Sequence, residues 1–531
     1  MIEGSQCHAI GVERPKYNAT ASLPRVASNN TNQDVVEAEG RVLSRISPDP
    51  VPDEVRHGIA WDPIHPLYSE AQTIFDGLHY FNERVSGDLI SINSHFNPYQ
   101  VDLHGIDKIP RIYTNLLVST ATLHRTMQDD SSFIRSSALV QREQYLFQFR
   151  IRALQEVNYR ISNSDLQTSD STLMCVICLL LATMQASAYT DWRAHLEGAR
   201  RIIQLRGGPK EIISKNPYLK PLMALYIIID VMAATTTPAT HRCMPAAASM
   251  ALRYWEIETG FFQSILAISA PCPEDLFQSL ILVNYLRFIS TKPKLTSRRH
   301  AGTRMVFDKV RSFDPAEWAT RMKGFRGWKR TGDGVEFDMS RDEVQSPVQQ
   351  QQTQINTRSS SSPSMDETST IVHSLDSPGS GFWLSIGVIF RAAILLYTMR
   401  TLILDLPESK GFLYEADQPL DFEEIRRETR QDLATSLAPL FLSTDSARRI
   451  GKLVFFPIFI CGMEADPDDG ELQEFVTRGL YMLGQTMGTF GPVSAVDELR
   501  RKWAADAAAP AGSRVTWDDY FLSRPDFIFG Y

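Results

Sequence analysis

The segment from Asp191 to Gly208, DWRAHLEGARRIIQLRGG, constrains the fold most, because its apolar residues repeat with the period of a helix. The residues of this apolar stripe are Trp192, Leu196, Ala199 and Ile203. Charged residues at i,i+4 steps, Arg193, Glu197 and Arg201, fall on the opposite, solvated side. Asp191 is suited to cap the helix, and Gly207-Gly208-Pro209 is typical of a left-handed helix stop. The segment is predicted to be one well-terminated helix of a larger bundle.

The same helical period recurs along most of the chain. Residues 141–161 place four apolar side chains on one stripe, Leu146, Phe149, Ala153 and Val157. Similar patterns cover residues 70–290 and resume from Phe382 to Trp503, whereas strand-like alternation is nearly absent. Hydrophobic residues make up 43% of the chain, which is enough for a substantial core. The predicted fold is therefore all-α, a large helical array or bundle.

Two segments have little to bury. Residues 1–65 are polar and contain Pro48, Pro50 and Pro52, so a disordered N-terminal arm is expected there. Residues 341–380 are rich in Gln, Ser and Pro and are predicted to form a low-complexity loop. This loop would separate a first helical block, residues 70–340, from a second block, residues 381–531.

The longest apolar runs could be mistaken for membrane spans, which need about 20 residues. Each is interrupted: 222–234 by Asp230, 383–397 by Arg391, and the short run 453–462 by Pro457. We therefore predict buried helices and no membrane partner.

The six cysteines are spread over the whole length: Cys7, Cys175, Cys178, Cys243, Cys272 and Cys461. Cys175 and Cys178 form a CxxC pair, but they lie in an almost unbroken apolar run without a second pair or a nearby ligand His. Core packing is the favoured interpretation, since buried free cysteines behave as small hydrophobic residues. Sparse cysteines and no secretory signal after Met1 favour a reducing intracellular compartment.

The chain contains none of the common catalytic motifs: no GxSxG, HExxH, phosphate loop ending in GK[ST], or GxGxxG after a strand. Asp466, Asp468 and Asp469 lack the spacing of a calcium loop and are expected to cap a helix that begins near Glu471. His195 lies beside the apolar stripe of its helix and has no identifiable partner for catalysis. We predict no catalytic, cofactor-binding or metal-binding residues, no cofactor, and no enzyme activity.

Charge is unevenly distributed along the chain. The overall charge is −8, but residues 292–330 contain twelve Lys and Arg against three acids. Arg298, Arg299, Lys329 and Arg330 are the candidates for a basic patch in this segment. Three interpretations stay open: a nuclear import signal, a phosphate-contacting surface, or a solvated loop that offsets acidic neighbours. The loop is favoured, because no tight run of four or five basic residues is present.

The helix at 192–205 also carries an ordered motif: Trp192, His195, Leu196, Gly198, Ala199 and Gly207. This order resembles the regulatory domain of fungal-specific transcription factors. Segments that resemble the same family in the same order are 79–81 with 97–98, 230–235, 313–318, 393–402 and 456–465. The resemblance spans about residues 70 to 530. It implies that both helical blocks form one regulatory domain, and that the six motif residues have a structural role.

The chain departs from the family at its DNA-reading module. That module is a binuclear zinc cluster of closely spaced cysteines with interleaved basic residues, and the scattered cysteines of this chain cannot form it. The segment before residue 60 also lacks a basic run that would contact phosphates. Two alternatives stay open: the module is encoded upstream of Met1, or the protein regulates without one.

The resemblance implies a nuclear transcriptional regulator, expected to control metabolic or biosynthetic genes. Its expected partners are other transcription regulators or a DNA-binding partner, with indirect or weak DNA association. A small-molecule effector is a further hypothesis: a metabolite or partner that binds among the helices and favours one of two states of the domain. The alternative is a cytosolic helical scaffold or small-molecule-binding protein without a role in gene regulation.

Overall fold

Helices dominate the part of the chain that the computed structural model describes. That part is 70–91, 96–129, 144–187, 192–257, 261–262, 271–322, 327–331, 334–338, 380–406, 420–442, 451–510, 515–524 and 527–528. The backbone alone is described for 108, 129, 144–147, 327–331, 334–338 and 380. The chain divides into residues 1–67 and 68–531, and all described residues belong to the second unit. The predicted arm, 1–65, and nearly all of the predicted loop, 341–380, lie outside them.

The first series of helices runs from residue 70 to residue 321. It consists of α2 (Glu70–Tyr80), η2 (Phe81–Val85), α3 (Ser86–Asp88), η3 (Leu103–Lys108), α4 (Arg111–Asp129), α5 (Gln144–Ser162), α6 (Asp170–Ala186), α7 (Trp192–Leu205), α8 (Pro209–Lys215), η6 (Pro217–Leu219), α9 (Lys220–Thr236), α10 (Met244–Tyr254), α12 (Glu274–Ser290), η7 (Pro293–Leu295), α13 (Thr296–Ser312) and α14 (Pro315–Arg321). The second series consists of α16 (Ser380–Met399), η8 (Arg400–Leu404), α18 (Phe422–Leu437), η9 (Ala438–Phe441), η10 (Gly451–Leu453), α20 (Phe455–Met463), α21 (Gly470–Met487), α22 (Gly491–Ala508) and α23 (Trp517–Leu522). The all-α prediction is confirmed.

One short hairpin was not predicted. Strands β1 (Gly327–Thr331) and β2 (Gly334–Asp338) pair antiparallel, with Gly327 opposite Asp338 and Thr331 opposite Gly334. Each strand has five residues, and the segment GWKRTGDGVEFD contains too few apolar positions to establish a period of two. The sequence Gly-Asp-Gly at 332–334 was the signal that could have indicated a hairpin.

Several helix ends follow from local side chains. Asp469 accepts a hydrogen bond from the backbone N–H of Leu472 (3.1 Å), so the predicted capping role is confirmed for this aspartate. Helix α7 ends as predicted, because Gly207 and Gly208 have φ angles of +92° and +105° and both backbone N–H groups bond back into the last turn. The predicted cap of the same helix, Asp191, lies outside the described residues.

Helix α9 is buried on all sides, with 15 of its 17 residues inside the core. The continuous helices Pro217–Thr236 and Gly381–Leu404 reach 20 and 24 residues, so both are long and apolar enough to span a membrane, and the prediction that their interrupting residues rule this out was wrong. Their apolar windows are 89% and 72% buried within the protein, which matches the prediction of core helices. The interrupting Asp230 lies inside α9, where it is paired with other polar side chains.

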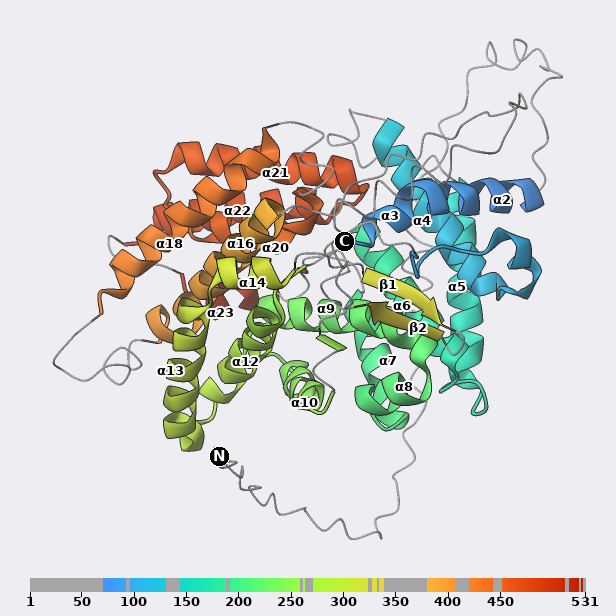
Figure 1. Cartoon of the computed structure of the whole chain (residues 1–531), viewed down its shortest axis with the longest axis horizontal. Helices are drawn as coiled ribbons and strands as arrows, with labels where there is room; N and C mark the ends of the chain where they lie inside the picture. The colour runs from blue at the N-terminus through green and yellow to red at the C-terminus, as the bar shows by residue number, and fades with distance from the viewer. Residues whose placement is uncertain are drawn as a thin grey trace, which may run out of the picture. The chain divides into compact units, whose positions relative to one another are not determined.

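The packing joins distant parts of the sequence (Figure 1). Helix α6 packs on α4, α5 and α7, whereas α16 packs on α14, α18 and α20. Helix α12 connects these groups through contacts with α9, α10, α13 and α16. Helices α21 and α22 return to contact α4 and α6, so the two series meet directly in a second place.

Candidate functional site

The motif on α7 is largely part of the core. Trp192, Leu196 and Ala199 are fully buried, His195 and Gly198 are half-buried, and Gly207 is exposed at the helix end. The helix packs on α6, where Val176 lies 3.9 Å from the position that a Cβ on Gly198 would occupy. These placements put the three most buried motif residues in the hydrophobic core; the structural role assigned to all six stays a prediction.

A buried ion pair, not predicted from the sequence, anchors the same helix. The Nε of Arg200 donates to Oδ1 of Asp230 on α9 over 2.5 Å, and the Tyr254 hydroxyl donates to Oδ2 over 2.6 Å. Both Arg200 and Asp230 are almost completely buried. Burial by itself lowers the pKa of Arg200, but Asp230 and, to a smaller extent, Tyr226, Glu197 and Tyr254 together more than offset this, so the guanidinium stays charged. One feature of the sequence could have indicated this ion pair: on a helical wheel, Arg200 falls within the apolar stripe of α7.

The Cys175–Cys178 pair lies on α6 among apolar residues, with Cys175 fully buried. Burial raises the pKa of Cys175 to about 12, so its thiol stays protonated at neutral pH. No group of three or more His, Cys, Asp or Glu side chains among the described residues is arranged to hold a metal ion.

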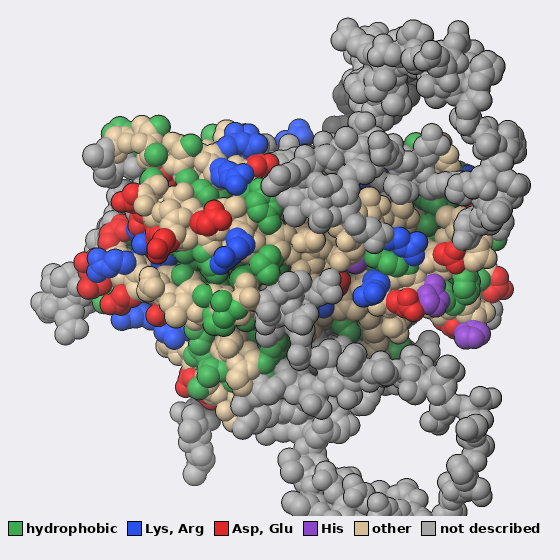
Figure 2. Space-filling model, turned by 90° about the horizontal axis from the view of Figure 1, so that it is seen from above, with side chains coloured by type: hydrophobic (Ala, Val, Ile, Leu, Met, Phe, Trp, Pro, Cys, Tyr) green, Lys and Arg blue, Asp and Glu red, His purple; other side chains and the backbone are tan. Residues whose placement is uncertain are grey.

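Only two of the four candidate basic residues, Arg298 and Arg299, have side chains that the structure describes. Arg298 is exposed on α13, but the neighbouring Arg299 is only 4% exposed and contacts His300 (2.8 Å). Lys329 and Arg330 lie in β1, where only the backbone is described. On the face that Figure 2 presents, Lys and Arg side chains lie among Asp and Glu rather than in an area of one sign. The patch stays a prediction, with Arg298 as its one exposed member among the described side chains.

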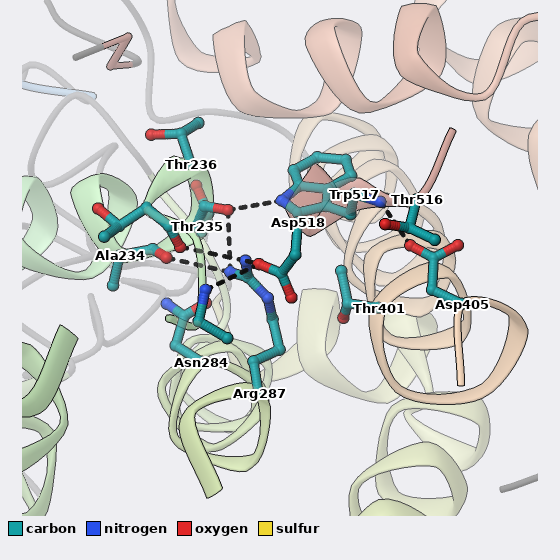
Figure 3. A network of polar contacts seen from close by, with 12 residues as sticks. Ala234, Thr235, Thr236, Asn284, Arg287, Thr401, Asp405, Thr516, Trp517 and Asp518 are labelled. Atoms are coloured by element: carbon teal, nitrogen blue, oxygen red, sulfur yellow. Dashed lines mark hydrogen bonds and ion pairs between the residues drawn. The ribbon is translucent and has the colours of Figure 1, made fainter. Parts of the chain in front are cut away.

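A second buried arginine binds the C-terminal segment to the core (Figure 3). Arg287, on α12, is fully buried and forms an ion pair with Asp518 of α23. Its guanidinium also donates to the carbonyls of Thr235 (3.0 Å) and Ala234 (3.1 Å). The indole N–H of Trp517 donates to the Thr235 carbonyl over 2.7 Å. This network holds three elements together, the end of α9, α12 and α23.

Asp405 borders this network and carries a perturbed carboxyl. Its Oδ2 accepts from the backbone N–H of Trp517 (2.6 Å), and its Oδ1 lies 3.1 Å from Nε of Arg400. Burial raises the pKa of Asp405 from 3.8 to about 6, against the opposing effect of Arg400. The folded state therefore retains this proton at a pH where the unfolded chain has lost it.

We expect this group to make the protein less stable as the pH rises from about 4 to about 7. Over that window the folded state binds more protons at Asp405 than the unfolded state, so the free energy of unfolding falls, by about 2 to 3 kcal/mol. Urea unfolding at several pH values, compared between the wild type and Asp405→Asn, measures the effect. The Asn variant should lose this part of the pH dependence; identical slopes would contradict the assignment.

A cavity of about 100 Å³, partly open to solvent, lies where the two series of helices meet. Its wall is mostly apolar and is formed by Phe81, Val85, Leu89, Tyr99, Leu116, Leu117, Leu181, Leu222, Leu225 and Met487. Five further lining residues carry polar groups or a thiol: Asp88, Tyr113, Thr120, Cys178 and Gln185. Such apolar cavities with a few placed polar groups are the usual form of small-molecule sites.

Direct contacts between the two series of helices surround this cavity. Gln185 of α6 donates to the carbonyl of Gly488 (3.1 Å), and its own carbonyl accepts from the N–H of Phe490 (3.0 Å). Nζ of Lys452 lies 3.2 Å from Oδ1 of Asp88 and donates to the Gly87 carbonyl (2.9 Å). A molecule in the cavity would therefore contact residues that join the first series to α21.

Comparison with known proteins identifies the class to which this fold belongs. The family model for the fungal specific transcription factor domain matches residues 77–530, and the chain belongs to this family. The predicted resemblance is thus confirmed. The family indicates a role in the regulation of transcription, which is not a class of enzyme.

One curated relative shares 21% identity over 362 residues, which is 67% of this chain and 55% of the relative. It is the phomenoic acid biosynthesis cluster-specific transcriptional regulator of Leptosphaeria maculans. The chain therefore matches only about half the length of this relative. No solved structure matches the chain.

Proposed function

We propose that this protein is a nuclear transcriptional regulator that controls metabolic or biosynthetic genes. The observation that carries the proposal is the match of the fungal specific transcription factor domain to residues 77–530, which includes nearly all described helices. The name of the Leptosphaeria relative, which refers to a biosynthesis cluster, supports genes of that type as targets. The two helical blocks act as one regulatory domain.

The regulatory domain acts on transcription through other proteins. On the face that Figure 2 presents, Lys and Arg side chains are interspersed with Asp and Glu, so this face offers little for contacts with DNA phosphates. The partners are other transcription regulators or a DNA-binding protein, and any association of these helices with DNA is indirect or weak. A small-molecule effector would act by binding one state of the domain more tightly than another.

Nuclear localisation together with promoter occupancy tests the proposal. A fluorescent fusion of the full chain is imaged in its own cells, and chromatin immunoprecipitation of the tagged protein is sequenced. We expect nuclear fluorescence and enrichment at promoters of a limited gene set whose transcripts change when the gene is deleted. A strictly cytosolic protein without promoter enrichment would overturn the proposal in favour of a cytosolic scaffold or binding protein.

Nuclear import gives a separate prediction for the basic segment. If the segment is an import signal, reversing the charge of Arg298, Lys329 and Arg330 to Glu in the fusion reduces nuclear accumulation severalfold, because import signals are read through their positive charge; the favoured solvated loop predicts no change. Arg299 is left unchanged, since a glutamate at this buried position would destabilise α13.

The matched control reverses three exposed basic residues elsewhere, Lys210, Lys215 and Arg427. The control changes the net charge by the same amount and should leave import intact. If both triple variants accumulate in the nucleus like the wild type, the segment is a solvated loop.

A further inference from the structure

The wall of the cavity between the two series of helices carries polar groups with hydrogen-bonding capacity that no described residue uses, among them Oε1 of Gln185 and the hydroxyl of Tyr113. Both amide protons of Gln185 are committed, to the carbonyls of Thr120 (3.2 Å) and Gly488 (3.1 Å). Its Oε1 is buried and accepts no hydrogen bond in the described part of the protein. Since an unsatisfied buried acceptor is costly, this oxygen is a position where a bound molecule could supply the missing donor.

The second unused group is the hydroxyl of Tyr113 on α4. Tyr113 lines the cavity, and its hydroxyl makes no hydrogen bond to any residue that the structure describes. Burial raises the pKa of Tyr113 well above its usual value, so the hydroxyl keeps its proton and can both donate and accept. Tyr99, which also lines the cavity, differs because its hydroxyl already donates to the Pro221 carbonyl (3.0 Å).

The charge of the cavity restricts what it can bind. Asp88 is the one Asp, Glu, Lys, Arg or His among the residues that line it. Its carboxylate already faces Nζ of Lys452 at 3.2 Å and Nε2 of His124 at 3.6 Å. An anion would find no uncommitted cation in this wall, and a cation would compete with Lys452 for Asp88. A neutral molecule is therefore favoured.

Size sets the remaining limit. A dry apolar cavity of about 150 Å³ accepts one benzene ring. This cavity has a smaller volume, about 100 Å³, but it is open to solvent, so a single small ring would fill it and extend into the opening. The apolar wall offers contacts to a small ring or a short branched chain.

We propose that this cavity binds a compact, neutral, mainly apolar molecule that carries a hydroxyl group, with the hydroxyl placed between Gln185 and Tyr113. Such a molecule contacts α4, α6 and α9 of the first series and Met487 of α21, so it stabilises the contact between the two series. That this contact controls transcription rests on the proposed function; the binding itself does not.

The test uses phenol, benzene, benzoate and benzylamine as probes of the full purified chain. Ligand-observed NMR titrations at neutral pH measure the affinity of each probe. We expect saturable binding of phenol, weaker binding of benzene, and no saturable binding of benzoate or of protonated benzylamine. Hydrogen exchange of the backbone around 485–490 should slow when phenol is bound, because the ligand stabilises the contact of α21 with α4 and α6.

Three variants test whether the probes bind in the cavity or elsewhere on the protein surface. Tyr113→Phe removes only the unused hydroxyl and should weaken phenol binding about three- to tenfold without changing the affinity for benzene. Cys178→Leu fills part of the cavity and should abolish binding of both. Tyr159→Phe is the matched control, because Tyr159 is 61% exposed on α5 and does not line the cavity.

Each other outcome overturns a stated part of the proposal. Equal affinity for phenol and benzene, unchanged in Tyr113→Phe, would mean that the hydroxyl is not recognised. Tighter binding of benzoate or benzylamine would overturn the neutral class. No saturable binding of any probe to wild type and Tyr159→Phe would overturn the site. None of these results bears on nuclear localisation or promoter occupancy, so the proposed function succeeds or fails independently.

Discussion

Replacing Asp230 with Ala is expected to lower the free energy of unfolding by about 3 to 5 kcal/mol. The variant leaves the Arg200 guanidinium buried without the carboxylate that lies 2.5 Å from its Nε, and it also removes the acceptor of the Tyr254 hydroxyl. Glu197 stays paired with Arg200, but its side chain is one-third exposed and cannot replace a buried partner. Urea unfolding followed by far-UV circular dichroism measures the loss.

Two control variants show whether the loss of stability comes from breaking the ion pair. Asp432→Ala, at an exposed position of α18, should change the free energy of unfolding by less than about 0.5 kcal/mol. The double variant Arg200→Met/Asp230→Leu removes both charges and should recover most of the lost stability, because a buried ion pair contributes little beyond well-packed apolar side chains. If Asp230→Ala is as stable as the wild type, the ion pair does not anchor α7 to α9.

Replacing Trp192 with Ala should cost a similar amount, about 3 to 5 kcal/mol. Trp192 is fully buried at the start of α7, in the core cluster shared with α6 and α9. The substitution leaves a cavity and removes the ring over which Arg193 lies at 4.4 Å. Thermal and urea unfolding should both show the loss, together with a lower level of the protein in cells.

Trp255→Ala is the matched control, since Trp255 is 49% exposed at the end of α10 and its removal leaves no buried cavity. Its effect on stability should be far smaller than that of Trp192→Ala. A Trp192→Ala protein that folds normally and yet loses control of its target genes would show that this motif residue has a regulatory rather than a structural role.

Local patterns accounted for much of the secondary structure. The apolar stripe of Trp192, Leu196 and Ala199 predicted both the helix and its buried face, and the structure confirms both. The two glycines predicted the left-handed end of the same helix. The secondary-structure prediction failed for the hairpin formed by β1 and β2, because its strands are too short for an alternating pattern to be detected. It also failed for the length of the apolar helices, since helix continues past the apolar run into Pro217–Leu219 and Arg400–Leu404.

Residues 192–208 show what the sequence by itself determined: a helix, its buried face and its end, because each depends on neighbours within a few turns. The ordered motif similarly determined the family, which the match to 77–530 confirms. The tertiary structure alone decided which distant residues meet. Arg200 reaches Asp230, Arg287 reaches Asp518, and Gln185 reaches Gly488 across 303 positions of the chain. These contacts, and the cavity that Gln185 lines, depend on how helices pack, and no local period encodes that.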